Sequence, residues 1–409
     1  RMAHADGDRP EPRRASQPEV IRADAELPDE ICANVPDQPP AADPEAILIT
    51  GATGFLGAHL VADWLDASNA RLHCLVRAAS PEAAVARVRD NLARYGLWHD
   101  RYAKRLIGVP GDLGEPALGL SRHDFEALAD RVDAVVHNGG VVNFLKPYEL
   151  LRPANVDGTR EVIRLAATGR PTALHMVSTL GVFLTPARRG GLVSERDVPD
   201  DCTGLTGYNA SKWAADALVR AARDRGLTVS IYRPARITGQ SVTGIGNTDD
   251  YFSRLLKTFI QLGAVPEILD DEADLMPVDH VAAGIGYLSR RPDRWGQDFH
   301  FYNNRTISFP DLAKALSSFG YPVGMLPYPQ WRSALLARPD AALAPFTPLF
   351  GPASPRRTQP DFDCTATETA LAAGGLACPP ADAALIHTYL SWFVQTGFLD
   401  APTLGRTGD

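Results

Sequence analysis

The amino-acid sequence predicts an α/β protein, with a doubly wound, mostly parallel sheet and a smaller, mainly helical C-terminal subdomain. Three observations support this prediction. Short apolar runs alternate with helical repeats from residue 45 to about residue 239, glycine and polar residues follow the ends of most of these runs, and the regularity fades afterwards. Strands that alternate with helices form βαβ units, whose strands pair in parallel.

Each element follows from its own pattern of apolar residues. Strands are predicted at residues 46–50, 71–76, 106–109, 132–137, 173–177 and 229–232, with a late strand at 298–302. The helix after the first strand is indicated by the spacing of Leu60, Val61, Trp64 and Leu65. Further helices are predicted at 82–95, 125–129, 155–167, 208–223, 251–262 and 383–393, and a proline-rich loop at 345–360.

The first 43 residues differ in composition from the rest of the chain. They are rich in proline, alanine and charge, which is typical of a linker, although the apolar stretch at 27–35 is expected to dock on the body. We expect this leader to connect the chain to a preceding domain. The predicted sheet domain covers 44–240, with 276–306 returning to it, and the predicted subdomain covers 241–275 and 307–405.

Composition narrows the classes of function. The chain has 409 residues and a formal net charge of -8, which argues against nucleic acid as a partner because phosphate binding needs clustered Lys and Arg. Its five cysteines show neither CxxC pairing nor metal-ligand spacing, so we expect reduced thiols and no metal site. No apolar run is long enough for a membrane span and no signal peptide opens the chain, so a cytoplasmic location is expected.

A glycine-rich turn follows the first predicted strand. Gly51, Gly54 and Gly57 stand three residues apart, between that strand and the next helix. Glycine permits a tight turn and a close approach of the backbone to a ligand, and a helix N-terminus binds phosphate. In this context the pattern favours a Rossmann-type dinucleotide site, and the alternative is a merely structural turn.

The residues after the second and third strands bear on the choice of cofactor. Arg77 stands where NAD-binding chains usually place an acidic residue, and Arg87 follows ten residues later. Arginine binds a 2′-phosphate through charge-assisted hydrogen bonds, so NADPH is favoured over NADH, unless both arginines are solvated surface residues. Asp112 is placed either to accept from an adenine amino group or to act as a turn residue.

Tyr208 and Lys212 form a Tyr-x-x-x-Lys pattern near the start of a predicted helix. Residues four apart share a helix face, so the Lys212 cation is expected to lower the pKa of the Tyr208 phenol and make it a usable proton donor. Thr179, after the fifth strand, is the predicted hydroxyl that donates to a substrate oxygen, and Ser178 is the alternative. The alternative for the whole pattern is an ordinary amphipathic helix.

Several longer segments make the assignment more specific. They are residues 48–57, 95–98, 111–113, 136–143, 147–148, 155–159, 243–247, 261–263 and 276–279. With these segments the chain resembles the extended short-chain dehydrogenase/reductases and, more narrowly, the terminal thioester reductase domains of non-ribosomal peptide and polyketide synthases, kin of the reductase domain of carboxylic acid reductases. One departure is Ala235, where the resemblance leads us to expect glycine.

The resemblance implies a function and a set of contacts. A carrier domain upstream presents an acyl or peptidyl thioester on its phosphopantetheine arm, and NADPH reduces it to an aldehyde and then to a primary alcohol. Thr179 and Tyr208 stabilise and protonate the oxygen, while Lys212 holds the nicotinamide ribose. The cofactor-binding residues implied are Gly51, Thr53, Gly54, Phe55, Leu56, Gly57, Arg77, Arg87, Asp112, Leu113, Asn138, Gly139, Tyr208, Lys212, Pro234 and Ile237.

Two other functions stay open at this stage. One is a stand-alone dehydrogenase or epimerase that acts on a sugar nucleotide or another small carbonyl compound. The other is a redox-sensing regulator that binds a dinucleotide without turnover, although such a protein has no need of Tyr208 and Lys212. As a domain, the chain is expected to act as a monomer.

Overall fold

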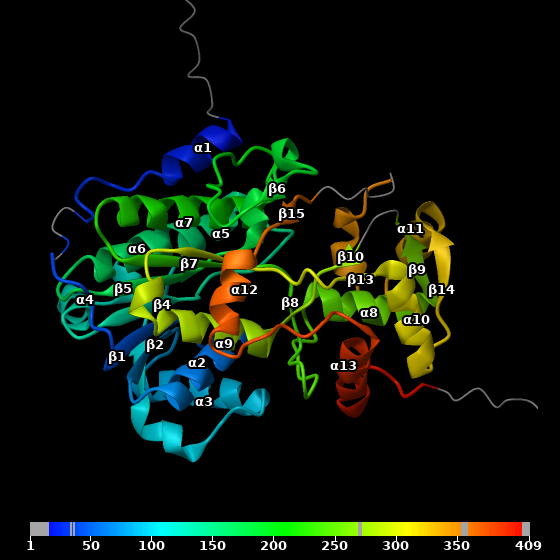
Figure 1. Cartoon of the computed structure of the whole chain (residues 1–409), viewed down its shortest axis with the longest axis horizontal. Helices are drawn as coiled ribbons and strands as arrows, with labels where there is room; N and C mark the ends of the chain where they lie inside the picture. Colours follow the sequence, from blue (N-terminus) through cyan, green and yellow to red (C-terminus); the bar gives the residue numbers. More distant parts are fainter. Residues whose placement is uncertain (1–15, 33–34, 36, 269–271, 353–358, 403–409) are drawn as a thin grey trace, which may run out of the picture.

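A parallel seven-stranded sheet forms the centre of the larger part of the molecule (Figure 1). The computed structural model describes residues 16–32, 35, 37–268, 272–352 and 359–402. The strand order in the sheet is β12-β7-β5-β4-β1-β2-β3, and every neighbouring pair is parallel. The bounds are β1 (Ala46–Thr50), β2 (Arg71–Val76), β3 (Leu106–Pro110), β4 (Ala134–His137), β5 (Ala173–Val177), β7 (Val229–Pro234) and β12 (Asp298–Phe301). The predicted fold class and all seven predicted strands are therefore confirmed.

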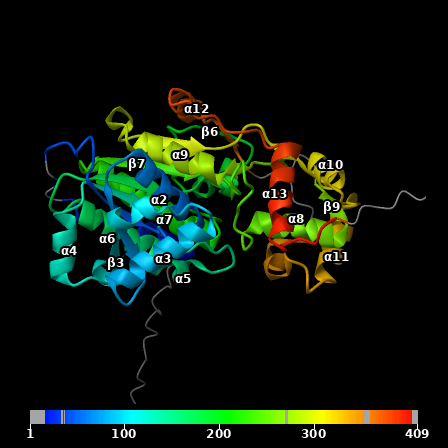
Figure 2. The same ribbon diagram turned by 90° about the horizontal axis from the view of Figure 1, so that it is seen from below.

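Helices cover both faces of the sheet, as Figures 1 and 2 show. Except for the edge strand β3, which is partly exposed, the strands are apolar runs buried along almost their whole length, as expected for a parallel sheet that is covered on both faces. One face packs against α2 (Phe55–Ala67), α3 (Pro81–Arg94), α9 (Val278–Ser289) and α12 (Thr365–Ala372). The other packs against α4 (Arg122–Ala129), α5 (Tyr148–Arg152), α6 (Gly158–Ala166) and α7 (Gly207–Asp224).

Short helical turns complete the connections. A π-helical turn at Pro153–Asp157 joins α5 to α6, so the predicted helix at 155–167 begins earlier and changes its winding. The 3₁₀ turns are Asp100–Arg105, Pro116–Gly119, Leu180–Phe183, Pro186–Arg188, Pro292–Arg294 and Ala344–Leu349. The last of these lies in the region predicted as a loop at 345–360, of which residues 353–358 are outside the described residues.

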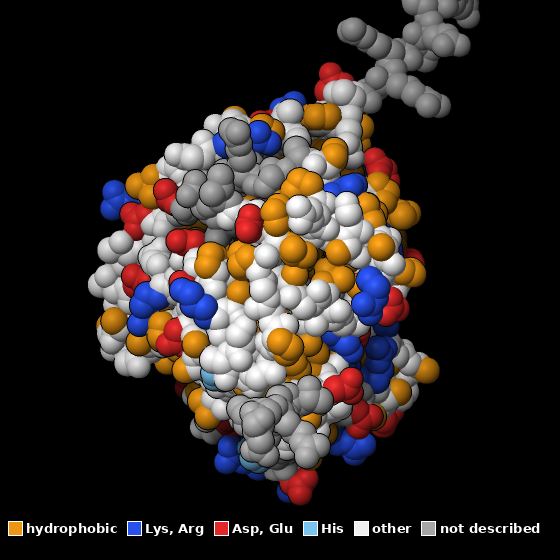
Figure 3. Space-filling model, turned by 90° about the vertical axis from the view of Figure 1, so that its right-hand side faces the viewer, with side chains coloured by type: hydrophobic (Ala, Val, Ile, Leu, Met, Phe, Trp, Pro, Cys, Tyr) orange, Lys and Arg blue, Asp and Glu red, His pale blue; other side chains and the backbone are white. Residues whose placement is uncertain are grey.

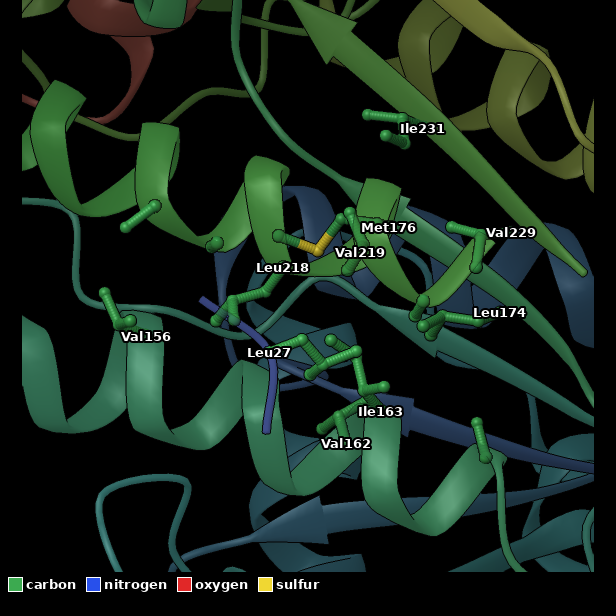
Figure 4. Close-up of a cluster of buried hydrophobic side chains, with 14 of the residues drawn as sticks. Leu27, Val156, Val162, Ile163, Leu174, Met176, Leu218, Val219, Val229 and Ile231 are labelled. Carbon is green, nitrogen blue, oxygen red and sulfur yellow. The ribbon is translucent and has the colours of Figure 1, made fainter. Parts of the chain in front are cut away.

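Part of the leader belongs to the folded body. Residues 17–24 form helix α1 (Gln17–Asp24), which linker-like composition did not predict, while residues 1–15 lie outside the described residues. Leu27 and Ile31 are buried, and Figure 4 shows Leu27 beside side chains of α6, α7 and β5. Arg225 donates to the carbonyls of Leu27, Pro28 and Ile31 at 2.7, 2.6 and 2.9 Å. The predicted docking of the stretch at 27–35 is confirmed for these residues.

A second hydrophobic core lies beside the sheet domain. It contains residues from 252–265, 273–275, 307–343 and 381–399. Its elements are α8 (Tyr251–Leu262), α10 (Phe309–Phe319), α11 (Tyr328–Leu336), α13 (Ala383–Gln395) and the parallel pair β9 (Ala264–Glu267) and β14 (Gly324–Pro327). Figure 3 views the molecule from this end, where side chains of both charge signs are interspersed with apolar ones.

One segment departs from the predicted boundary of the subdomain at 307–405. Helix α12 packs on α9 and β12, and its Leu371 lies in a core cluster of the sheet domain. Residues 361–372 therefore lie against the sheet domain, because Ala370 and Leu371 bury their apolar surface there. The short pairs are β6 (Leu192–Val193) with β15 (Asp361–Phe362), β8 (Ile237–Thr238) with β11 (Met276–Pro277), and β10 (Glu272–Ala273) with β13 (Ile307–Ser308). Residues 403–405 lie outside the described residues.

Candidate active site

The glycine turn lies at the point where the strand order reverses, between β1 and β4. Gly51 has a φ of +73°, and a Cβ there would lie 2.8 Å from the Cα of Gly139. A Cβ on Gly57 would lie 1.9 Å from the Gly51 carbonyl oxygen, so the first turn of α2 packs directly on the loop. Crevices at such switch points, beyond the carboxyl ends of the strands, are where ligands bind in open α/β sheets.

Helix α2 points its N-terminus into this crevice. Gly54 is its N-cap residue and is exposed; no side chain caps the helix there, and no acidic residue lies in its first turn. Thr53, Phe55 and Leu56 are the residues around this helix start. The unpaired N–H groups and the partial positive charge of such a terminus fit the pyrophosphate of a dinucleotide. The cradle in this structure therefore fits a nicotinamide dinucleotide.

Residues after β3 and β4 close the same crevice. The Asn138 amide nitrogen lies 3.5 Å from the Gly51 carbonyl, and a Cβ on Gly139 would lie 2.4 Å from a Leu113 methyl group. Asp112 accepts from the Gly114 N–H at 2.9 Å, which is the turn role that the sequence left open. Adenine recognition by Asp112 stays a prediction.

The two arginines predicted for a 2′-phosphate lie together. Both Arg77 and Arg87 are exposed, and the Arg87 guanidinium donates to the Arg77 carbonyl. This contact brings the first turns of α3 to the carboxyl end of β2. The side chain of Asn91, further along the same helix, donates to the Gly54 carbonyl at 3.0 Å and joins α3 to the glycine turn.

The hydroxyls of Ser178 and Thr179 have different partners. The Ser178 hydroxyl donates to the buried Asp216 carboxylate at 2.8 Å. The Thr179 hydroxyl accepts from the Gly181 N–H at 3.1 Å. Because a hydroxyl has one proton to donate, Ser178 has none left for a substrate, whereas Thr179 still has its own. This geometry favours Thr179 for the catalytic role.

Tyr208 and Lys212 lie in the first two turns of α7. Lys212 is buried and donates from Nζ to the Val177 carbonyl at 2.8 Å, and burial lowers the pKa of Lys212 to about 8. Burial raises the pKa of Tyr208 to about 12. The prediction that Lys212 lowers the phenol pKa is therefore wrong for this structure, because desolvation of the phenolate dominates and the ammonium is directed at the end of β5.

Asn155 is a residue of this site to which the sequence analysis gave no role. It is buried, its side chain bonds both the N–H and the carbonyl of Val141 at 2.6 and 3.0 Å, and its amide donates to Ser211 Oγ at 2.9 Å. Ser211 in turn donates to the Tyr208 carbonyl at 2.8 Å. Asn155 therefore ties the loop after β4 to the helix that carries Tyr208. A polar residue within the apolar repeat of a predicted helix was the available signal.

The remaining predicted cofactor residues are less closely connected to this group. Pro234 ends β7 and is in register with Phe301 of β12, while Ile237 in β8 is in register with Met276 of β11.

His137, to which no role was assigned, is buried between the hydroxyls of Thr50 and Thr159 at 2.7 and 3.0 Å. Within the described residues no group of side chains could hold a metal ion, and no helix is long and apolar enough to cross a bilayer.

Known proteins are similar to this chain in sequence and in fold. The family described as male sterility protein, an NAD-binding group, matches residues 49–285. The solved terminal R domain from the myxalamid PKS-NRPS biosynthetic pathway is 41% identical, with a TM-score of 0.88 over 94% of this chain and 99% of that one. The R domain of a nonribosomal peptide synthetase from Mycobacterium tuberculosis is 27% identical, with a TM-score of 0.76 over 90% and 95%.

Curated relatives are much longer than this chain. A linear gramicidin synthase polypeptide of Brevibacillus parabrevis is 38% identical over 376 residues, which are 89% of this chain and 7% of that protein. The L-2-aminoadipate reductase large subunit from Penicillium chrysogenum is 35% identical over 88% of this chain and 28% of that protein. The chain thus spans less than a third of the length of each of these two relatives.

Proposed function

Because this chain belongs to the male sterility protein family, as a reductase domain of the terminal R type, we propose that it reduces a carrier-bound acyl or peptidyl thioester with NADPH. The products are the free thiol and an aldehyde, and a second round converts the aldehyde to a primary alcohol. The observation that carries the proposal is the placement of Thr179 at the end of β5 and of Tyr208 and Lys212 at the start of α7, with the Thr179 proton free to donate.

In this proposal, different residues of the crevice bind different parts of the cofactor. When bound, the nicotinamide supplies hydride to the thioester carbonyl carbon. The turn at Gly51–Gly57 and the start of α2 hold the pyrophosphate, and Arg77 and Arg87 hold the 2′-phosphate. Lys212 keeps two of its three N–H donors beyond the bond to Val177, and these can hold the ribose hydroxyls.

Proton transfer falls to Tyr208. Since burial raises its pKa to about 12, the phenol keeps its proton at neutral pH until an alkoxide, a stronger base than the phenolate, develops on the substrate. Thr179 donates a hydrogen bond to the same oxygen. The protonated product is a hemithioacetal, whose C–S bond breaks as the hydroxyl proton moves to the leaving thiolate. Thiol and aldehyde are released.

The test is product analysis by mass spectrometry with an acyl-pantetheine thioester and excess NADPH. We expect aldehyde and alcohol from the wild type, and a rate about 10²- to 10⁴-fold lower in Tyr208→Phe. Tyr287→Phe is the matched control, because Tyr287 lies on α9 and its hydroxyl accepts from Arg291, just beyond the end of that helix, at 3.2 Å. Turnover of a sugar nucleotide without turnover of any thioester would contradict the proposal.

The cofactor preference has its own test. Arg77→Ala and Arg87→Ala should each raise the KM for NADPH about tenfold to a hundredfold, with little change for NADH, because each removes a charge-assisted hydrogen bond to the 2′-phosphate. Arg89→Ala is the control, since Arg89 is exposed on the same helix and pairs with Asp90 at 3.4 Å. Equal KM values for the two cofactors in the wild type would contradict NADPH preference.

A further inference from the structure

An apolar loop beside the proposed catalytic tyrosine is exposed. The loop follows β4, and Val141, Val142, Phe144 and Leu145 in it are 36, 65, 40 and 43% exposed. Single exposed apolar residues are common, but four in five consecutive positions are a concentration that needs a reason, since each leaves apolar surface in water. We call residues 141–145 the apolar loop.

Hydrogen bonds hold the apolar loop in this exposed position. At its start, the side chain of Asn155 bonds both backbone groups of Val141. At its end, Asn143 Oδ1 accepts from the N–H groups of Leu145 and Lys146 at 3.0 and 2.8 Å. The next helix is anchored where the Tyr148 hydroxyl donates to Asp24 of the docked leader at 2.9 Å. The apolar side chains are therefore presented by a fixed backbone.

The apolar loop reaches the reacting centre. The Phe144 ring stands edge-on to the Tyr208 ring, with centroids 5.4 Å apart and an interplanar angle of 79°. A Cβ on Gly207, directly before Tyr208, would lie 2.4 Å from the Lys146 carbonyl oxygen, so the start of α7 packs on the end of the loop. Whatever covers the apolar loop thus lies within reach of the phenol that protonates the substrate.

We propose that the apolar loop binds the hydrocarbon part of the acyl chain, and that the preferred substrates are thioesters of extended apolar acyl groups. This inference rests on the proposed function. Residues 139–145 carry no charged side chain, so the loop offers no partner for a charged or strongly polar acyl group. The substrate is the occupant favoured over a protein partner, because it is the molecule that must approach Tyr208.

The experiment compares butanoyl- and octanoyl-pantetheine. Each methylene that moves from water onto an apolar surface favours binding by about fourfold, so octanoyl should exceed butanoyl in kcat/KM by at least about tenfold in the wild type. The variant is Val142→Ser/Leu145→Ser, which keeps the contact between Phe144 and Tyr208. In it the ratio should fall to about threefold or less. Leu336→Ser, at the end of α11 and 50% exposed, is the control and should keep the wild-type ratio.

Two further measurements separate the possible outcomes. Calorimetric Kd values for the two thioesters test the binding of the acyl chain without any need for turnover. If the wild-type protein binds the octanoyl thioester more tightly but reduces neither thioester, only the proposed function is contradicted. Octanoyl loaded on a carrier domain tests the protein alternative. A wild-type ratio near one overturns the inference. It is also overturned if the double variant loses activity only toward the carrier-bound substrate, because the loop would then dock protein.

Discussion

Lys212 and Asp216 lie one turn apart on α7, and both are buried charged residues, yet their surroundings differ. Asp216 accepts hydrogen bonds from Arg233 at 2.9 Å through each carboxylate oxygen, from Arg220 at 3.1 Å and from Ser178 at 2.8 Å. Its pKa is held below its usual value, because these partners outweigh the cost of burial. The bond that the structure gives Lys212 goes to a neutral carbonyl, and burial lowers the pKa of Lys212.

The difference separates a structural charge from a functional one. The carboxylate of Asp216 is fully compensated and fixes α7 against β7 through Arg233, which a second carboxylate, Asp298, also contacts at 2.8 Å. The ammonium of Lys212 is left with unused donors at the edge of the crevice. A buried charged group whose hydrogen-bond donors are reserved for a ligand has fewer partners within the protein. Such a group therefore lowers the stability of the unliganded fold.

The largest expected effect is on stability, from Asp216→Ala. Removing the carboxylate leaves the fully buried Arg233 with half of its charge partners, and breaking a buried ion pair in this way costs about 3–5 kcal/mol. Chemical denaturation followed by circular dichroism measures the change. Asp224→Ala, at the exposed end of the same helix, is the control and should stay within about 0.5 kcal/mol. A small loss for Asp216→Ala would show that Asp298 alone compensates Arg233.

The next effect is on catalysis, from Lys212→Met. We expect kcat for thioester reduction to fall about 10²- to 10³-fold, the range seen when one preorganised donor is removed, while the fold is retained. Lys257→Met is the matched control, because Lys257 also donates to a backbone carbonyl, that of Phe398 at 2.7 Å. Equal activity losses in the two variants would mean that the bond type, and not the position of Lys212, is what matters.

The pH dependence of stability should carry the signature of Lys212. The folded chain releases this proton near pH 8, whereas the unfolded chain releases it near 10.5, so between these values the unfolded state binds more protons and stability rises with pH. The gain of the wild type over Lys212→Met across this window should approach about 3 kcal/mol. Denaturation of both proteins at pH 7 and pH 10 measures it. Parallel pH profiles would refute the lowered pKa.

The smallest effect is expected from Arg220→Ala. Arg220 bonds a single oxygen of Asp216, its side chain is 18% exposed, and Arg233 keeps the bidentate contact in its absence. We expect a loss of about 1 kcal/mol in the free energy of unfolding, with unchanged reduction kinetics. A loss as large as that of Asp216→Ala would show that Arg220 and Arg233 act as one unit.

Local patterns in the sequence determined the fold class and the glycine turn after β1. The apolar runs predicted all seven strands of the sheet, and the glycine spacing predicted the turn at Gly51, because both depend on neighbours along the chain. The pairing of the helix that carries Tyr208 and Lys212 with the strand end at Thr179 followed from the rule that ligands lie beyond the carboxyl ends of parallel strands.

Only the tertiary structure decided the partners and the environment of each group. It assigned the Ser178 proton to Asp216, raised the pKa of Tyr208 against the prediction, and identified Asn155 as the link between the loop after β4 and helix α7. It also showed that α1 and α12 both pack on the sheet domain. Burial and hydrogen-bond partners come from residues far apart in the chain, and a local pattern carries no information about them.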